Sequence, residues 1–152
     1  MFKNIKNPVA FGRKWDSESE LSYYKYLIGI YGIENIELQP KFELIPGVKL
    51  KNGKKQSAIT YSPDFKIGNK VIEFKGFLTE ASRLRIKMFN WKYPEFDFEV
   101  ISENPDKNSM IKFVTYDEAQ KCLREQRKKK ATKKLKVTKP RKKPLKWFCF
   151  LT

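Results

Sequence analysis

The sequence predicts an α/β domain, in which helices pack on a central mixed sheet of roughly four or five strands. Three patterns point to this class. Apolar residues follow Ser17 at helical spacing, they alternate with polar residues between Ile59 and Phe74, and a second helical segment after Thr79 leads into another alternating run. Helices and short strands that alternate in this way are typical of one domain built around a single sheet.

The first helix is expected to begin after Ser17 and to end at Gly32. Ser17 and Glu20 have the spacing of a capping box, in which both side chains bond free backbone N–H groups of the first turn. Glycine is common just after the last turn of a helix. Residues 1–10, which are basic and lack periodicity, are expected to form an N-terminal arm. The apolar face of the helix consists of Leu21, Tyr24, Leu27, Ile28 and Tyr31.

The segment from residue 34 to residue 50 is expected to be a strand with a continuation. Pro40 interrupts the apolar run, which favours a bend or an edge position. Gln39, directly before it, either lines a site or is an ordinary polar residue of the strand. Residues 51–55 are expected to form a turn, whose lysines are either solvated or in contact with a phosphate backbone.

A β-hairpin is predicted next, and the rest of the chain is organised around it. Its first strand would span residues 59–67 and its second residues 71–74, with Gly68-Asn69 as the turn. Asp64 would then lie on the first strand, close to the second. A hairpin brings such side chains together at the cost of one short loop.

Glu73 and Lys75 are two residues apart, so they are expected to project from one face of the second strand, near Asp64. Two carboxylates beside one ammonium need further positive charge, which a hard divalent cation supplies. Mg²⁺ prefers oxygen ligands and often binds through one or two carboxylates together with water and substrate phosphate. Such an ion activates water and stabilises charge on a phosphoryl oxygen, and Lys75 could hold the attacking water or stabilise the developing charge.

This cluster therefore suits phosphodiester hydrolysis. The alternative interpretation is structural: Asp64 starts a turn, and Glu73 and Lys75 form an exposed pair on a strand. The apolar strand context on both sides, together with Pro63 and Gly76 next to the charged residues, favours the catalytic interpretation.

The motif YSPDF followed by IEFKG resembles the PD-(D/E)xK nuclease superfamily. Over roughly residues 11–101 the chain is similar to small phage members of it. These are the endonuclease I type of Holliday-junction resolvase and a group of phage proteins with an F-D-S-x-x-E, Q-P-x-F, D-F and E-x-K-G layout. The resemblance implies a restriction-endonuclease-like αβββαβ core and bound Mg²⁺ or Mn²⁺. It also implies that Asp64 and Glu73 bind metal, that Lys75 is catalytic, and that Glu20 is the family's additional acid.

Glu20 has two interpretations. It is either the carboxylate of the capping box, with no part in catalysis, or a ligand to the metal or to a metal-bound water. The local pattern favours the cap, and the resemblance favours the ligand. Glu18 is a weaker candidate for the same role.

A second helix is predicted from about residue 80 to Trp91, capped by Thr79, with core contacts from Leu84, Ile86, Met88, Phe89 and Trp91. Arg83 and Lys87 are four residues apart on another face, where they would contact DNA phosphates or form a solvated basic stripe. Residues 96–100 and 111–114 are expected to be strands. A helix is expected to begin at about Asp117 and to end in the lysine-rich stretch that follows.

Charge is concentrated at the C-terminal end of the chain. The net charge is +16, and residues 121–152 hold 14 of the 33 Lys and Arg residues but only one of the 17 acidic residues. We expect residues 11–120 to be the nuclease domain and residues 121–152 a partly disordered tail that binds nucleic acid through phosphates. The basic residues assigned to this contact are Lys128, Lys129, Lys130, Lys133, Lys134, Arg141, Lys142 and Lys143. The aromatic terminal segment WFCFLT could dock on the domain, cover a partner subunit or stack on bases.

Composition excludes several classes of function. The chain has no histidine, so histidine-based catalysis and histidine-containing zinc sites are excluded. Its two cysteines do not form a disulfide framework. No apolar run is long enough to span a bilayer, and no signal peptide is evident. We therefore expect a cytoplasmic protein that does not associate with membranes. If the protein is phage-encoded, this is the cytoplasm of the host cell.

The predicted function is a Mg²⁺-dependent DNA endonuclease. The resemblance points further, to a homodimeric phage enzyme that cuts branched or four-way DNA in recombination. The enzymatic alternative is a restriction-type or DNA-degrading nuclease. The non-enzymatic alternatives are a DNA-binding protein that uses the basic tail and a degenerate nuclease fold that serves as an adaptor.

Overall fold

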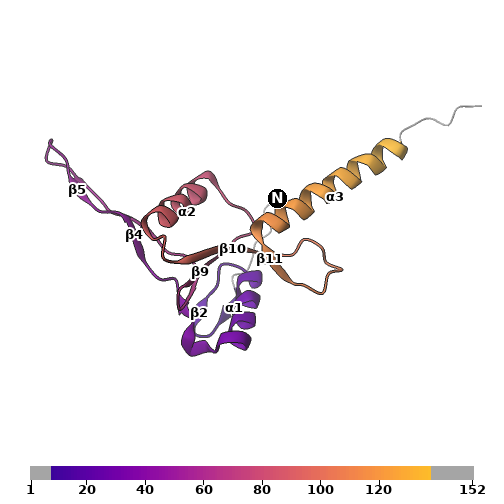
Figure 1. Cartoon of the computed structure of the whole chain (residues 1–152), viewed down its shortest axis with the longest axis horizontal. Helices are drawn as coiled ribbons and strands as arrows, with labels where there is room; N and C mark the ends of the chain where they lie inside the picture. The colour runs from indigo at the N-terminus through magenta and orange to yellow at the C-terminus, as the bar shows by residue number, and fades with distance from the viewer. Residues whose placement is uncertain (1–7, 138–152) are drawn as a thin grey trace, which may run out of the picture.

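The computed structural model describes residues 8–137, which form three α-helices around a central mixed sheet (Figure 1). The predicted α/β class is therefore confirmed. In chain order the elements are β1 (Val9–Ala10), β2 (Arg13–Lys14), α1 (Glu18–Tyr31), the 3₁₀ helix η1 (Ile33–Asn35), β3 (Glu37–Leu38), β4 (Phe42–Ile45), β5 (Val48–Lys49), β6 (Lys55–Gln56), β7 (Ile59–Tyr61), β8 (Phe65–Ile67), β9 (Lys70–Phe74), α2 (Glu80–Lys92), β10 (Asp97–Glu103), β11 (Phe113–Thr115) and α3 (Tyr116–Val137).

The central sheet has five strands in the order β11-β10-β9-β8-β3. Its β9–β10 pair is parallel and the other pairs are antiparallel. A parallel pair needs a crossover connection, which α2 supplies between β9 and β10. The sheet is thus mixed, as the sequence predicts, and β9 lies at its centre.

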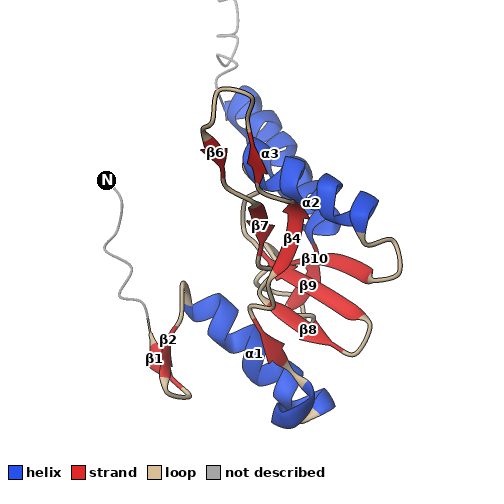
Figure 2. Ribbon diagram, turned by 90° about the vertical axis from the view of Figure 1, so that its left-hand side faces the viewer, coloured by secondary structure: helices blue, strands red, loops and turns tan. Residues whose placement is uncertain are grey.

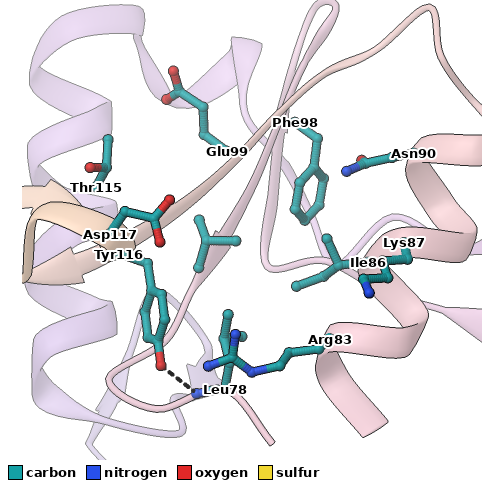
Figure 3. Close-up of a pocket in the computed structure, with 11 residues that line it drawn as sticks. Leu78, Arg83, Ile86, Lys87, Asn90, Phe98, Glu99, Thr115, Tyr116 and Asp117 are labelled. Atoms are coloured by element: carbon teal, nitrogen blue, oxygen red, sulfur yellow. Dashed lines mark hydrogen bonds between the residues drawn. The ribbon is translucent and has the colours of Figure 1, made fainter. Parts of the chain in front are cut away.

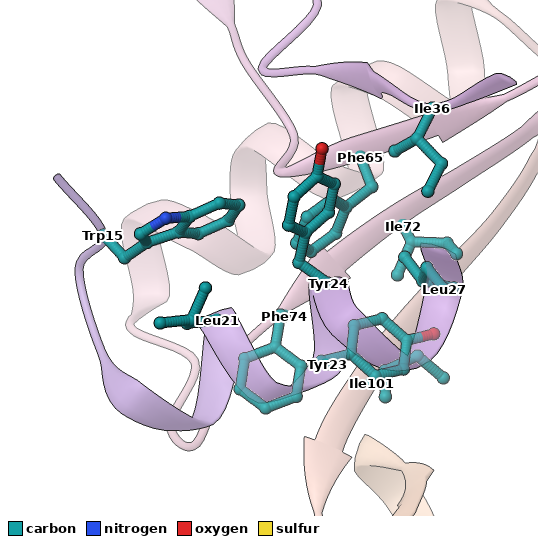
Figure 4. Packing of buried hydrophobic residues seen from close by; sticks show 10 residues of the cluster. All are labelled: Trp15, Leu21, Tyr23, Tyr24, Leu27, Ile36, Phe65, Ile72, Phe74 and Ile101. Atoms are coloured by element: carbon teal, nitrogen blue, oxygen red, sulfur yellow. The ribbon is translucent and has the colours of Figure 1, made fainter. Parts of the chain in front are cut away.

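The two faces of the sheet are covered by different helices (Figure 2). Because side chains alternate along a strand, Ile72 and Phe74 of β9 pack toward α1 while Val71 packs toward α2. The cluster under α1 is rich in aromatic rings and is shown in Figure 4. Its buried members are Trp15, Leu21, Tyr23, Tyr24, Leu27, Ile36, Phe65, Ile72, Phe74 and Ile101.

Both predicted ends of the first helix are confirmed. The Ser17 hydroxyl accepts the backbone N–H of Glu20 at 3.0 Å, and Gly32 follows the helix with a φ of 81°. Only glycine adopts such a φ at little cost. Directly before the helix, Trp15 is buried and its indole N–H donates to the Ala10 carbonyl at 3.0 Å, which ties the β1–β2 hairpin to the domain.

The predicted hairpin turn is confirmed, but its first strand is divided. Ile67 pairs with Lys70, so Gly68-Asn69 is a two-residue turn. Residues 59–67 form two strands instead of one, with β7 paired to β4 and β8 in the central sheet. Pro63 lies at the break, where it cannot donate a backbone hydrogen bond to either sheet.

A similar bend divides the strand predicted between residues 34 and 50. Gln39 has a φ of 49°, and β3 before it belongs to the central sheet while β4 after it pairs with β7. Beyond β4 and β7 the two chain segments continue as β5 and β6 around the predicted turn. We call residues 46–58 the ribbon, because they form a two-stranded hairpin that projects away from the core (Figure 1).

The core face of α2 differs from the prediction. Phe89 is buried and Ile86 and Met88 are partly buried, but Leu84 and Trp91 are 59% and 83% exposed. Leu84 and Trp91 are seven residues apart and so share one side of the helix, which faces away from the sheet. The cap at Thr79 is confirmed, since its hydroxyl accepts the N–H of Ser82 at 3.1 Å.

Helix α3 is longer than the sequence suggests. Its first turns pack on the sheet through buried Tyr116 and Ala119, and it then extends away from the core (Figure 1). The domain boundary expected at residue 120 falls inside this helix. Residues 121–137, which were expected to be part of a partly disordered tail, are helical. Lysine, arginine, glutamine and alanine are good helix formers, so this stretch needs no apolar face to be helical.

The rest of the predicted tail, with the aromatic segment at residues 147–150, lies outside the described residues. Within residues 8–137, no helix is long and apolar enough to cross a membrane.

Candidate active site

The predicted cluster forms where the chain leaves β7 and enters β8. Asp64 lies at this break, and its Oδ2 accepts the backbone N–H of Phe74 at 2.8 Å. That bond anchors the carboxylate to the end of β9, beside Glu73 and Lys75. The interruption at Pro63 therefore has a role, because it turns a residue between two strands toward the centre of the sheet.

Lys75 joins the two carboxylates. Its Nζ lies 3.3 Å from Oε1 of Glu73 and 3.7 Å from Oδ2 of Asp64. The Lys75 side chain is 35% exposed, whereas those of Asp64 and Glu73 are each 6% exposed. The ammonium thus stands at the mouth of the site and the carboxylates lie inside it.

The backbone of Lys75 is fixed from β10. The Lys75 N–H donates to the Ile101 carbonyl at 2.9 Å, and the Ser102 hydroxyl donates to the Lys75 carbonyl. Both main-chain polar groups are therefore held by the neighbouring strand, so the position of Lys75 depends on the parallel β9–β10 pair.

Tyr61 is a member of the site that the sequence analysis missed. Its hydroxyl donates to Oε2 of Glu73 at 3.0 Å, and its ring packs on Phe89 of α2 with centroids 5.7 Å apart. Burial, and after it the charge of Glu73, raises the pKa of Tyr61, so it stays a proton donor. The available signal was that a buried tyrosine needs a partner for its hydroxyl, in a segment with few candidates other than the acids.

Glu20 faces the same cluster from the first turn of α1. It is buried, and its pKa is raised to about 7 by burial first and then by repulsion from Asp64 and Asp16, while Lys75 lowers it. The serine half of the capping box is present, and the Asp16 backbone lowers the pKa of the Glu20 carboxylate without outweighing burial. Glu20 thus belongs to the electrostatic field of the site, beyond any capping role.

Electrostatics show a shortage of positive charge. Burial, and then the neighbouring Asp64, raises the pKa of Glu73 to about 7, although Lys75 and Tyr61 oppose this. Burial also raises the pKa of Asp64. Burial lowers the pKa of Lys75, but Asp64 and Glu73 outweigh it and the net shift is upward. Three buried carboxylates share one ammonium, so an added cation would compensate them.

A cavity of about 500 Å³ opens beside Glu20 and Lys75. Its walls come from the start of α1, the ends of β9 and β10, and the base of α3. Gly76 lines it directly after Lys75, and Ser17, Ser102 and Asn104 add polar groups. The cavity therefore gives a polar ligand access to the exposed side of the cluster.

The donor set fits a hard divalent cation that keeps much of its water. Within the described residues, no three acidic, cysteine or histidine side chains are close enough to form a complete metal cage. Asp64 and Glu73 are a two-carboxylate arrangement, which Mg²⁺ accepts together with water and phosphate oxygens. Glu20 is near in electrostatic terms but is not part of one cage with them.

The structure does not bring the predicted Arg83 and Lys87 into this site. Both line a different cavity of about 500 Å³ between α2, β10 and the start of α3 (Figure 3). The Arg83 guanidinium lies 5.9 Å from the ring centroid of Tyr116, whose hydroxyl accepts the backbone N–H of Leu78 at 3.2 Å. Their predicted contact with DNA phosphates stays a prediction, and it would lie at this second cavity instead of at the carboxylate cluster.

The predicted DNA-binding residues of the tail are only partly described. Lys128, Lys129 and Lys130 are exposed on α3. Lys133 and Lys134 occupy helical positions, but their side chains lie outside the described part of the structure, as do Arg141, Lys142 and Lys143.

One family model matches the chain, over residues 3–109, and its description is "Protein of unknown function (DUF1064)". No curated protein and no solved structure matches. The matched region contains Glu20, Asp64, Glu73 and Lys75 and ends before α3. Since it spans more than half of the 152 residues, the chain belongs to the DUF1064 family.

Proposed function

We propose that this protein is a metal-dependent DNA endonuclease of the PD-(D/E)xK type. The observation that carries the proposal is the convergence of Asp64, Glu73 and Lys75, with Nζ within 4 Å of both carboxylates and Glu20 in the same field. Burial of the carboxylates supports a functional interpretation, because buried charge that lacks full compensation is costly to folding.

The order of the elements supports the same proposal. Four strands of the central sheet and two helices follow one another along the chain as α1, β3, β8, β9, α2 and β10. This is the αβββαβ order that the resemblance implies. The β4–β7 pair and the ribbon are inserted between β3 and β8, and β11 adds an edge strand.

In the proposed enzyme, Asp64 and Glu73 would hold Mg²⁺ or Mn²⁺, and Glu20 would bind a water of that ion. When bound, the ion supplies an activated water and neutralises charge on a phosphoryl oxygen. The fit rests on the donor set, which is all carboxylate oxygen and short of positive charge.

The residues of the chain have separate tasks in this proposal. Lys75, at the mouth of the site, stabilises the negative charge that develops on the phosphate. Tyr61 and the backbone N–H of Phe74 hold Glu73 and Asp64 in place, each through one hydrogen bond. The cavity beside Glu20 and Lys75 admits the phosphodiester.

We propose DNA as the substrate because of the charge distribution. The exposed lysines of α3 begin where the helix leaves the core, and residues 121–152 hold 14 basic residues. Such a surface binds phosphates in a salt-dependent way. Preference for branched or four-way DNA, and a homodimer that presents two sites, rest on the resemblance to the resolvases.

The test is cleavage of a labelled four-way junction and a matched linear duplex, with Mg²⁺ or with EDTA. The wild-type protein is compared with Glu73→Gln and with the control Glu95→Gln, which changes an exposed glutamate outside the site. We expect Mg²⁺-dependent cleavage by the wild type and by the control, and none by Glu73→Gln.

Paired nicks at the junction alone would support the resolvase assignment. Equal cutting of both substrates would leave the nuclease and remove junction selectivity. Binding without cutting in Mg²⁺ or Mn²⁺ would overturn the proposal and make a non-catalytic DNA-binding role the better account.

A further inference from the structure

We propose that the ribbon, residues 46–58, is a second contact surface for duplex DNA, separate from the active site and from α3. The inference rests on the proposed function and adds a binding element to it. Three observations carry it: the ribbon lies outside the core, its shape is fixed by its own sequence, and its charge is uncompensated.

The ribbon contributes nothing to the hydrophobic core. All residues from 45 to 60 are exposed, and none belongs to either core cluster. In Figure 1 the ribbon and α3 leave the core on opposite sides of it. A two-stranded hairpin on its own is at best marginally stable in water, so packing does not explain why the chain keeps this one.

Local bonds define its shape. The backbone N–H of Leu50 donates to the Lys54 carbonyl at 2.8 Å, and that of Gly53 donates to the Leu50 carbonyl at 2.9 Å. Gly53 has a φ of 81°, which suits a three-residue turn. At the base, a Cβ on Gly47 would lie 3.1 Å from the carbonyl oxygen of Gln56, so the two strands approach closely there.

The charge of the ribbon is unusual for an exposed hairpin. It contains four lysines and no acidic residue, namely Lys49, Lys51, Lys54 and Lys55. Lys49 and Lys55 are direct cross-strand partners, and like charges in that position destabilise a hairpin. Among the described residues, none of the four has an acidic group within 4 Å, whereas Lys66, Lys70 and Lys92 of the core each do.

A polyanion would relieve this repulsion, and duplex DNA fits the shape. The major groove is about 12 Å wide and about 8.5 Å deep, and it admits a two-stranded β-ribbon. Outside the turn at residues 51–53, each side of the ribbon has five residues. At about 3.3 Å a residue, this length exceeds the depth of the groove. Val48 and Leu50 alternate with lysines, which leaves apolar side chains for sugar and base edges.

The test variant is Lys49→Gln/Lys55→Gln. Removing two like charges from directly opposed positions should not destabilise the hairpin. The matched control is Lys25→Gln/Lys112→Gln, which removes the same charge from exposed positions outside the ribbon. Affinity for a 40-base-pair duplex is measured in EDTA over a range of salt concentrations, and cleavage is measured separately in Mg²⁺.

We expect the ribbon variant to bind several-fold more weakly than the wild type. Its slope of log affinity against log salt should fall by about 2, because each lysine–phosphate contact contributes about 0.9. The control should keep the wild-type slope.

An unchanged slope and affinity in the ribbon variant, in a protein that still cleaves DNA, would overturn this inference and leave the proposed function intact. Absence of cleavage in the wild type would instead contradict the proposed function. Loss of a dimer in light scattering, with DNA affinity per subunit unchanged, would assign the ribbon to a protein partner and also overturn the inference.

Discussion

The active-site cluster and the ribbon are opposites in burial and in charge. Asp64 and Glu73 are buried, held by bonds from Phe74 and Tyr61, and short of positive charge. The ribbon is exposed throughout, shaped by its own backbone bonds, and has no negative charge. The first region depends on the core for its geometry, and the second depends on it for nothing except attachment.

The difference indicates what each region lacks. Buried carboxylates have few ways to gain positive charge, so a small cation that enters the cavity is the natural complement. Exposed lysines are already solvated, so their complement is an extended anion that displaces counterions. Changes in the cluster should therefore affect chemistry, and changes in the ribbon or α3 should affect binding and its salt dependence.

Lys75→Met should give the largest effect. It removes the ammonium that lies near both carboxylates, and we expect cleavage to fall by about two to three orders of magnitude. DNA affinity in EDTA should stay near the wild-type value. Single-turnover cleavage and a binding titration measure the two quantities, and Lys25→Met serves as a surface control. Equal losses in both would place Lys75 in DNA binding instead.

Tyr61→Phe should have a smaller effect on the same region. It deletes the hydroxyl that orients Glu73, and loss of such a supporting bond typically costs about 10- to 100-fold in metal affinity or activity. The free energy of unfolding should fall by about 1 to 3 kcal/mol, because a buried carboxylate oxygen loses its donor. Tyr26→Phe, at an exposed position of α1, is the control for both. Wild-type cleavage in Tyr61→Phe would remove Tyr61 from the site.

The metal-free protein should lose stability as pH rises. The pKa values of Glu20 and Glu73 are raised to about 7 in the folded state from an ordinary 4.5. Between these values the folded protein binds more protons than the unfolded chain, so the free energy of unfolding falls with increasing pH. Urea unfolding in EDTA from pH 5 to pH 8 measures this.

Glu73→Gln cannot ionise at this position, so its stability should depend less on pH than that of the wild type. The exposed Glu95→Gln should follow the wild type. Identical pH profiles for wild type and Glu73→Gln would contradict the electrostatic account of the cluster.

The exposed lysines of α3 are expected to contact DNA separately from the ribbon. Replacing Lys128, Lys129 and Lys130 with glutamine should reduce the slope of log affinity against log salt by about 3. The Lys49→Gln/Lys55→Gln variant of the ribbon should reduce it by about 2. The two sets are far apart on the molecule, so their effects should add when combined. If the variant that combines both sets has the same salt slope as one of the sets alone, one of the two surfaces does not contact DNA.

Sequence reasoning was most successful where the signals are local. Ser17, Gly32, Thr79 and the Gly68-Asn69 turn each act through backbone groups a few residues away, and each is confirmed. Asp64, Glu73 and Lys75 come together as predicted, because a two-residue turn fixes the register between their strands.

The misses involve tertiary structure. Alternation of apolar residues could not show that β7 and β8 belong to different sheets, since both sides of Pro63 fit a strand. The sequence left open which acid accepts the hydroxyl of Tyr61, and the fold places Glu73 beside it. Leu84 and Trp91 look like core residues by type, but the sheet meets the other side of α2.

The most direct test of the central claim is Mn²⁺ binding measured by calorimetry at pH 8, with wild-type protein and with Asp64→Asn. Asn keeps the shape of the side chain and its capacity to accept the Phe74 N–H, but it carries no charge. We expect the wild type to bind Mn²⁺ and Asp64→Asn to lose that binding while it remains folded. Equal binding by both proteins, or no binding by the wild type, would contradict the claim that these buried carboxylates form a metal site.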